Sequence, residues 1–275
     1  MIDWFISAAH AAAAEGGSHH DAGGFNPMHQ FTIDRYVHIK LFGYDASFTN
    51  SSLWMVMGTG LVLAFLIYSM REGRLVPTRM QSVSELTYEF VANMVRQNAG
   101  NAGMAYFPII FTIFVYVFAM NMLGMIPLPG LGNFTVTSHI IITFALAMFV
   151  FLGVTLIGFY KHGIKFLKLF VPSGVPALLL PLISVIEIIS YFTRPISLSV
   201  RLFANMMAGH TMLAVFGSFV VGLGAAGWLS PVAFLPFIFM VALMGLEILI
   251  AFLQAYVFAV LTCIYLNDAL HAGSH

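Results

Sequence analysis

The sequence predicts an all-α polytopic membrane protein. About five membrane helices and one amphipathic surface helix are expected, and the last two membrane helices are long, strongly tilted and paired as an antiparallel hairpin. Hydrophobic residues make up 60% of the 275 positions and charged residues only 8%, which leaves too much apolar surface for a soluble domain of this length. No Asp, Glu, Lys or Arg occurs between Tyr106 and Tyr160. The formal net charge is zero, so the composition gives no indication of a nucleic-acid partner.

Residues 1–50 form a polar segment, expected on the outer side of the membrane, ahead of a membrane domain over residues 51–275. The first residues have no basic stretch and only a short apolar run, so a cleaved secretory signal is not expected. The early histidines could bind a metal or belong to a flexible tail, and the lack of ordered ligand spacing favours the tail. These histidines are His10, His19, His20 and His29.

The membrane domain is expected to contain helices at about 51–70, 78–99, 106–126, 137–160, 182–222 and 231–267. The helix at 78–99 is amphipathic, because Val83, Leu86, Phe90 and Met94 share a face; it should lie at the membrane surface or pack under its neighbours. The last two runs exceed the ~20 residues that a perpendicular helix needs. Each could therefore hold two short helices or one long tilted helix.

Basic residues predict the orientation of the chain in the membrane. They follow the first span (Arg71, Arg74, Arg79) and the third (Lys161, Lys165, Lys168). The loop over 127–136 contains none. Because basic loops face the cytoplasm, the N-terminus should lie outside and the C-terminus in the cytoplasm.

Isolated charges mark the last hundred residues. Between Leu169 and Asn267 the only ones are Glu187, Arg194, Arg201 and Glu247. An arginine keeps its charge, and at mid-membrane it costs at least ~2.5–3.5 kcal/mol on insertion scales. Arg201 is therefore expected to face carboxylates of a partner, with a static salt bridge as the milder alternative. Glu187 and Arg194 could form a simple solvated pair.

The antiparallel hairpin predicts which side chains lie at one depth, because level residues then have nearly the same sum of residue numbers. By this rule Arg201 lies level with Gln254, and His210 with Glu247. His210 is nine residues from Arg201, about half a turn around the helix, and should point into the chain's own bundle. Small residues flank Arg201 and let another helix approach closely.

These side chains predict a proton path. Histidine and glutamate exchange protons near neutral pH, so His210 and Glu247 could line a hydrated entry. Glu187 lies ~21 Å from Arg201 along an ideal helix, toward the cytoplasm, and could serve an exit. Arg201 between them would repel a proton that ran straight through.

Asn121 and Gln254 have two possible roles. They could line the same hydrated entry, or they could simply hold helices together through hydrogen bonds. The sequence alone leaves both open.

Three stretches resemble subunit a of the Fo sector of rotary F-type ATP synthases. They are FPIIFTIFVYVFAMNMLGMIP (107–127), SLSVRLFANMMAGH (197–210) and GLEILIAFLQAYVFAVLTCIYL (245–266). The resemblance runs from about Pro77 to the C-terminus. It implies a stator subunit, not an enzyme on its own, that conducts protons through two offset half-channels to and from a rotating ring of c subunits.

The resemblance also implies residue roles and partners. Arg201 would face the ring's carboxylates and prevent a proton short circuit. The other implied path residues are Asn121, Glu187, Asn205, His210, Glu247 and Gln254. The implied partners are the c-ring, b-type peripheral stalk subunits and the remaining ATP synthase subunits, in a bacterial inner membrane. No cofactor or metal is expected.

Two positions depart from the family pattern. Some relatives carry Glu in place of His210 and His in place of Glu247, so that the pair is exchanged here. Gly124 stands where some relatives have Asp, and no role is assigned to it.

Other classes remain as alternatives. A secondary transporter would need inverted repeats, which are not evident. A haem or quinone protein would need paired intramembrane histidines, for which only His139 and His210 lie at a suitable depth. A structural scaffold would not need Arg201. No GxxxxGK[ST] motif occurs, so nucleotide binding is not predicted.

Overall fold

The structure, a computed structural model, describes residues 35–37, 40–41, 44–45, 48–71, 73–74, 76–126, 135–170, 179–225 and 231–271. The polar segment expected over 1–50, with its early histidines, therefore lies almost entirely outside the described residues. Its described parts are short strands in two antiparallel pairs. β1 (Arg35–Val37) pairs with β4 (Phe48–Thr49), and β2 (Lys40–Leu41) pairs with β3 (Tyr44–Asp45).

The predicted fold class is confirmed: the rest of the described chain is helical and holds five stretches long and apolar enough to cross a membrane. The helices are α2 (Asn50–Met70), α3 (Arg79–Gly103), α4 (Phe107–Met125), α5 (Ile140–His162), α6 (Leu180–Ala225) and α7 (Phe234–His271). Short 3-10 turns flank them at η2 (Met104–Tyr106), η3 (Val136–Ser138) and η4 (Gly163–Phe170).

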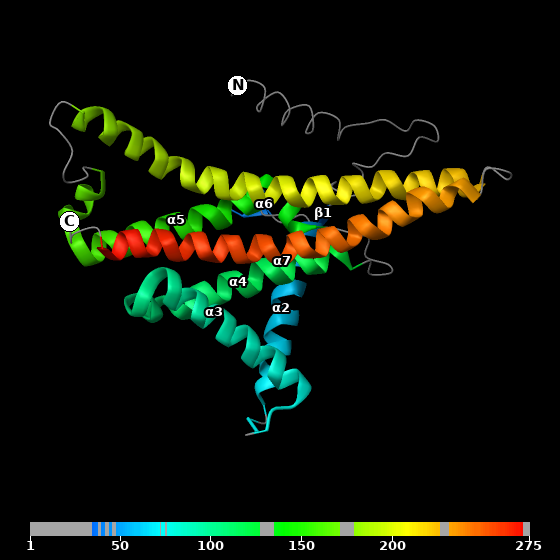
Figure 1. Cartoon of the computed structure of the whole chain (residues 1–275), viewed down its shortest axis with the longest axis horizontal. Helices are drawn as coiled ribbons and strands as arrows, with labels where there is room; N and C mark the ends of the chain where they lie inside the picture. The colour runs from blue at the N-terminus through cyan, green and yellow to red at the C-terminus, as the bar shows by residue number, and fades with distance from the viewer. Residues whose placement is uncertain are drawn as a thin grey trace.

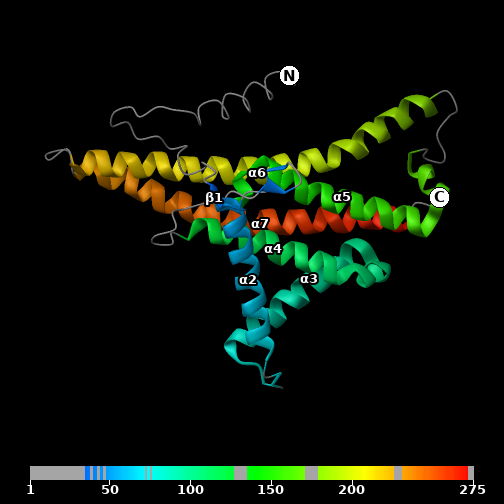
Figure 2. The same cartoon turned by 180° about the vertical axis from the view of Figure 1, so that it is seen from behind.

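Helices α6 and α7 are single long helices rather than two short ones each. They contain 46 and 38 residues. An ideal helix of 46 residues measures ~69 Å, more than twice the ~30 Å hydrocarbon core, so α6 must be strongly tilted in a bilayer. Figures 1 and 2 both show α6 (yellow) and α7 (orange to red) side by side and antiparallel.

Helix α6 bends away from α7 toward its N-terminal end (Figure 1). Pro195 lies inside α6, where its ring removes one backbone hydrogen bond and crowds the preceding turn. The proline therefore provides a physical reason for a bend in this part of the helix.

Helix α7 lies at the centre of the fold and contacts α3, α4, α5 and α6. Its inward face carries small residues, because Ala251, Ala255 and Ala259 have no exposed surface. Small side chains let neighbouring backbones approach closely, which is how helices pack without a hydrophobic driving force in lipid. The polar residues of α7 are therefore held at short range from α4 and α6.

The apolar face predicted for the amphipathic helix divides into two parts. In the second half of α3, Val91 and Met94 are buried, and α3 packs against α4 and α7. In the first half, Val83 and Leu86 remain exposed and line an apolar groove with α2 and α4. Packing under neighbours thus holds for the second half of α3 only.

Helix α2 is attached to the bundle at both ends. Trp54 is buried in a small apolar cluster with Met120, Leu123 and Val136. At the other end, the Ser69 hydroxyl lies 2.6 Å from the Ser84 hydroxyl of α3.

Candidate functional site

His210 of α6 and Glu247 of α7 meet in the interior of the hairpin. His210 Nδ1 lies 3.2 Å from Glu247 Oε1, and the two residues are 8% and 3% exposed. The neighbouring Gly209 makes this approach possible, because a Cβ at that position would lie 2.8 Å from Glu247 Oε1. The structure therefore places His210 inside the chain's own bundle, level with Glu247.

Gln254 pairs with Asn205, not with Arg201. The Asn205 side-chain amide donates to Gln254 Oε1 at 3.1 Å. The antiparallel rule placed Gln254 level with Arg201, and its partner instead lies one helical turn farther along α6. Arg201 is exposed, so it is not held by the buried face of α7.

Asn121 joins α4 to α7. Its side-chain amide donates to the Ala251 carbonyl at 3.3 Å, and the residue has no exposed surface. This contact lies one turn from both Glu247 and Gln254 along α7. We call Asn121, Asn205, His210, Glu247 and Gln254 the inner polar group.

Several atoms of the inner polar group lack a hydrogen-bond partner among the described residues. They are Asn121 Oδ1, Gln254 Nε2 and both Glu247 oxygens, although one of these oxygens lies at ion-pair distance from His210. A buried polar group without a partner costs about 1–3 kcal/mol, and ordered water is the usual remedy. This set of donors and acceptors is therefore suited to hold water between α4, α6 and α7.

Arg201 lies on the opposite side of α6 from the buried face. Its neighbours Leu202 and Met206 have no exposed surface, whereas Arg201, Ala204 and Ala208 are exposed. Within the described part of the chain Arg201 forms no ion pair. A permanent charge on an apolar helix is costly in a bilayer unless a counter-charge or water compensates it.

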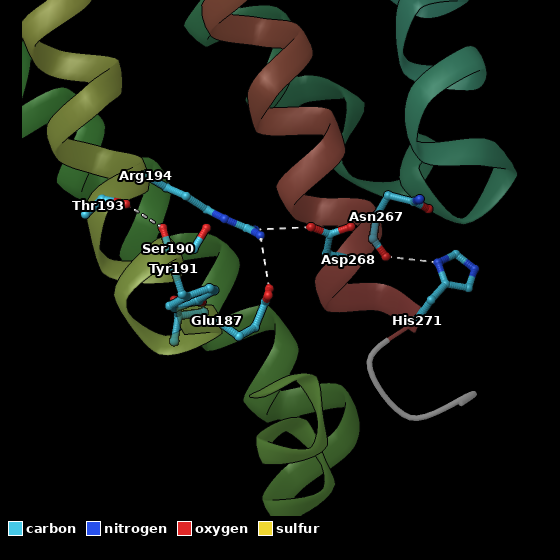
Figure 3. A network of polar contacts seen from close by, with 9 residues as sticks. Glu187, Ser190, Tyr191, Thr193, Arg194, Asn267, Asp268 and His271 are labelled. Carbon is cyan, nitrogen blue, oxygen red and sulfur yellow. Dashed lines mark hydrogen bonds and ion pairs between the residues drawn. The ribbon is translucent and has the colours of Figure 1, made fainter. Parts of the chain in front are cut away.

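A second polar group lies between the first half of α6 and the end of α7 (Figure 3). Arg194 Nη1 donates to Asp268 Oδ2 at 3.1 Å, and Arg194 Nη2 lies 3.9 Å from Glu187 Oε1. The guanidinium also lies 4.8 Å from the ring centroid of Tyr265. We call Glu187, Arg194 and Asp268 the terminal polar group.

Sequence reasoning did not single out Asp268. The antiparallel rule that pairs His210 with Glu247 places Arg194 level with residue 263, five residues short of Asp268, so it did not point to this contact. Asp268 lies beyond residue 267, the predicted end of the last helix, whereas α7 extends to His271. Glu187 and Arg194 are indeed close, but as two members of a three-residue group.

The described residues contain no cluster of three His, Cys, Asp or Glu side chains of the kind that holds a metal. The inner polar group offers proton exchange by a carboxylate and an imidazole, and the terminal polar group offers proton exchange by carboxylates alone. Arg201 and Arg194 contribute permanent positive charge.

The fold and the inner polar group together define the class: a multi-pass α-helical membrane protein with polar side chains, most of them buried, between its helices. Residues 52–267 match the family model described as ATP synthase A chain. The chain belongs to this family, and it is therefore a membrane subunit of an ATP synthase, with ATP synthesis and proton transport as its processes.

Curated relatives named ATP synthase subunit a cover most of the chain. The protein from Sinorhizobium medicae is 59% identical over 251 residues, which are 91% of this chain and 99% of the relative. The protein from Pelagibacter ubique is 60% identical over 247 residues, 90% of this chain and 98% of the relative. The protein from Parvibaculum lavamentivorans is 56% identical over 262 residues, 94% and 98% respectively.

Proposed function

We propose that the chain is the stator subunit that carries protons to and from the carboxylates of a rotating c-ring through two offset half-channels. The observation that carries the proposal is the division of polar residues on α6. Arg201 is exposed toward a partner and has no ion pair within the described chain, whereas His210 on the other side is buried against Glu247. One face thus suits a ring and the other a water path.

The inner polar group supports an entry half-channel. Water between α4, α6 and α7 would connect the bulk phase to Glu247 and His210, which exchange the proton. The Asn205–Gln254 pair would extend the water path to the part of α6 next to Arg201, because Asn205 lies one helical turn from Arg201. At that point the proton would pass to a ring carboxylate.

Arg201 keeps the two half-channels apart. A fixed cation repels a proton that would cross directly, and it attracts a ring carboxylate once that carboxylate has lost its proton. One charge that crosses 100 mV is worth ~2.3 kcal/mol, so a direct leak would dissipate the gradient that drives ATP synthesis. The chain is then a non-catalytic subunit.

The terminal polar group supports the second half-channel. Glu187 and Asp268 provide carboxylates on the other side of Arg201 along α6. With the N-terminus outside and the C-terminus in the cytoplasm of a bacterial inner membrane, these carboxylates would serve the cytoplasmic side. The c-ring, b-type stalk subunits and the other ATP synthase subunits are the proposed partners.

The test measures ATP-driven proton pumping and passive proton flux in inverted membrane vesicles that carry Arg201→Ala. We expect loss of pumping, with any passive flux running through the membrane sector without ATP. Arg96→Ala is the matched control, because Arg96 is an exposed arginine on α3. Normal pumping by the Arg201 variant would reduce this residue to a structural charge and would overturn the proposal.

The isolated chain provides a second test that separates the stator from the alternatives. Purified alone, it should neither make nor hydrolyse ATP. ATP hydrolysis by this chain alone would contradict the assignment. A haem absorption band in the visible spectrum, or solute exchange without the other subunits, would favour one of the alternative classes.

A further inference from the structure

Arg194 is the centre of the terminal polar group. It contacts one carboxylate on its own helix, Glu187, and one on α7, Asp268. Its side chain is 19% exposed, whereas those of Glu187 and Asp268 are 37% and 35% exposed. The cation is thus more enclosed within the chain than either carboxylate.

Aromatic rings fix the position of the guanidinium. It lies 4.8 Å from the ring centroid of Tyr265 on α7 and 5.5 Å from that of Tyr191 on α6. Tyr191 is itself buried, and its hydroxyl lies 2.6 Å from the Thr155 hydroxyl of α5. Cation–π contacts and the bond to Asp268 together restrict an otherwise flexible side chain.

The end of α7 is held in place by a second contact as well. His162 Nε2, at the end of α5, lies 2.9 Å from the Leu270 carbonyl, and Ala269 and Leu270 are buried. The last turn of α7 therefore has an anchor that does not involve Arg194. Because the His162 contact would still hold the end of α7 to α5 without Arg194, Arg194 is not needed only to hold this end of α7 in place.

We propose that Arg194 is a positioning residue that holds Glu187 and Asp268 together as one carboxylate pair at the end of the proton path. This inference rests on the proposed function. A proton that arrives from the ring binds one of the two carboxylates and is released from it to water, which leaves that carboxylate ionised again. Arg194 keeps its own proton throughout and fixes where the exchange takes place.

The experiment uses complete ATP synthase in inverted membrane vesicles, with the initial rate of ATP-driven proton pumping divided by the amount of assembled complex. The variants are Arg194→Gln, Arg194→Lys, Asp268→Asn and the double variant Arg194→Gln with Asp268→Asn. Arg96→Gln on α3 is the control for removal of an exposed arginine. Dividing by assembled complex separates transport from folding.

We expect Arg194→Gln and Asp268→Asn each to lower the rate per complex about tenfold, and the double variant to be no worse than the lower single one, because the residues act as one unit. Arg194→Lys should retain more than half of the wild-type rate, since it keeps the charge. Asp268→Asn is the safeguard against misfolding, because its amide oxygen can still accept the Arg194 bond.

Two results would overturn the inference. The first is a wild-type pumping rate per assembled complex in Arg194→Gln, whether or not the amount of assembled complex falls. The second is a double variant whose pumping loss equals the product of the two single losses, which would show that the residues act independently. The proposed function fails separately, if Arg201→Ala pumps normally. Loss of pumping in Arg201→Ala together with normal pumping in Arg194→Gln would reject only the role of Arg194.

Discussion

The inner and terminal polar groups both lie along α6 and α7, with Asn121 of α4 as a further member of the inner group, but they differ in how their polar atoms are satisfied. In the inner polar group, every member except Asn205 is buried, and several donors and acceptors have no partner among the described residues. In the terminal polar group, a fixed cation engages both nearby carboxylates at a half-exposed site. Open hydrogen-bonding capacity suits a path that must hold water, and a fixed cation suits a place where two carboxylates must be kept together in one position.

Glu247→Ala should have the largest effect, because it removes the acid of the buried pair. We expect pumping to fall on the order of 100-fold, the contribution typical of a positioned acid or base. The measurement is ATP-driven pumping per assembled complex in inverted vesicles. Wild-type pumping would show that the inner polar group only holds helices together. The inner polar group would then not be part of a water path.

Gly209→Ala should have the next largest effect. Its Cβ would lie 2.8 Å from Glu247 Oε1 and would force the carboxylate away from its position. Because the clashing atoms belong to the end of a flexible side chain, the carboxylate can move aside, so we expect a displaced Glu247 and about a fivefold loss of pumping rather than a loss of folding. Gly217→Ala is the matched control on the same helix, because its Cβ would meet nothing nearer than Met240 Sδ at 3.9 Å. Equal losses in the two variants would point to helix packing in general.

The exchange of His210→Glu with Glu247→His should have a smaller effect than either single change. The pair would still contain one acid and one imidazole in contact across α6 and α7. We expect the double variant to pump within roughly threefold of wild type, since directly contacting residues are coupled rather than additive. If the double variant pumps as poorly as the worse single variant, pumping requires histidine at position 210 and glutamate at position 247 specifically.

Thr155→Val should have the smallest effect and should leave pumping unchanged. It removes the hydroxyl partner of Tyr191, whose loss costs about 1 kcal/mol and lowers the inactivation temperature by roughly 2–4 °C. Residual pumping after heat treatment measures the shift. Thr112→Val is the control, because Thr112 is exposed and bonds only within its own helix. A direct loss of pumping at low temperature would extend the terminal polar group to α5.

The extent of the helices could be predicted from hydropathy, and the pairing of His210 with Glu247 from antiparallel geometry. Both depend on local periodicity, which lipid enforces strictly because every backbone group must be satisfied within the helix. The partner of Gln254 was not predictable to within one turn, because tilt and curvature shift the register between two long helices. Asp268 was missed for a related reason: sequence gives helix ends less well than helix interiors.

The sequence could not predict which half of the apolar face of α3 is buried, for a different reason. Val83 and Val91 are the same residue type in the same helix, yet one is 52% exposed and the other is fully buried. The difference arises from where α7 crosses, which is a property of the whole bundle and not of the segment. The periodicity of the sequence identifies the apolar face of a helix, but the packing of the other helices determines how much of that face is buried.

The length of α6 also determines how the chain experiences the membrane voltage. A helix of 46 residues that crosses the core once distributes the potential over more than twice as many residues as the ~20 of a perpendicular helix. One helical turn, 5.4 Å along the axis, then traverses only ~2.3 Å of the ~30 Å core. At 100 mV, where a full crossing is worth ~2.3 kcal/mol, moving a charge by one such turn changes its electrical energy by only ~0.2 kcal/mol. A proton that moves through water from one turn of α6 to the next therefore meets little electrical bias at each step.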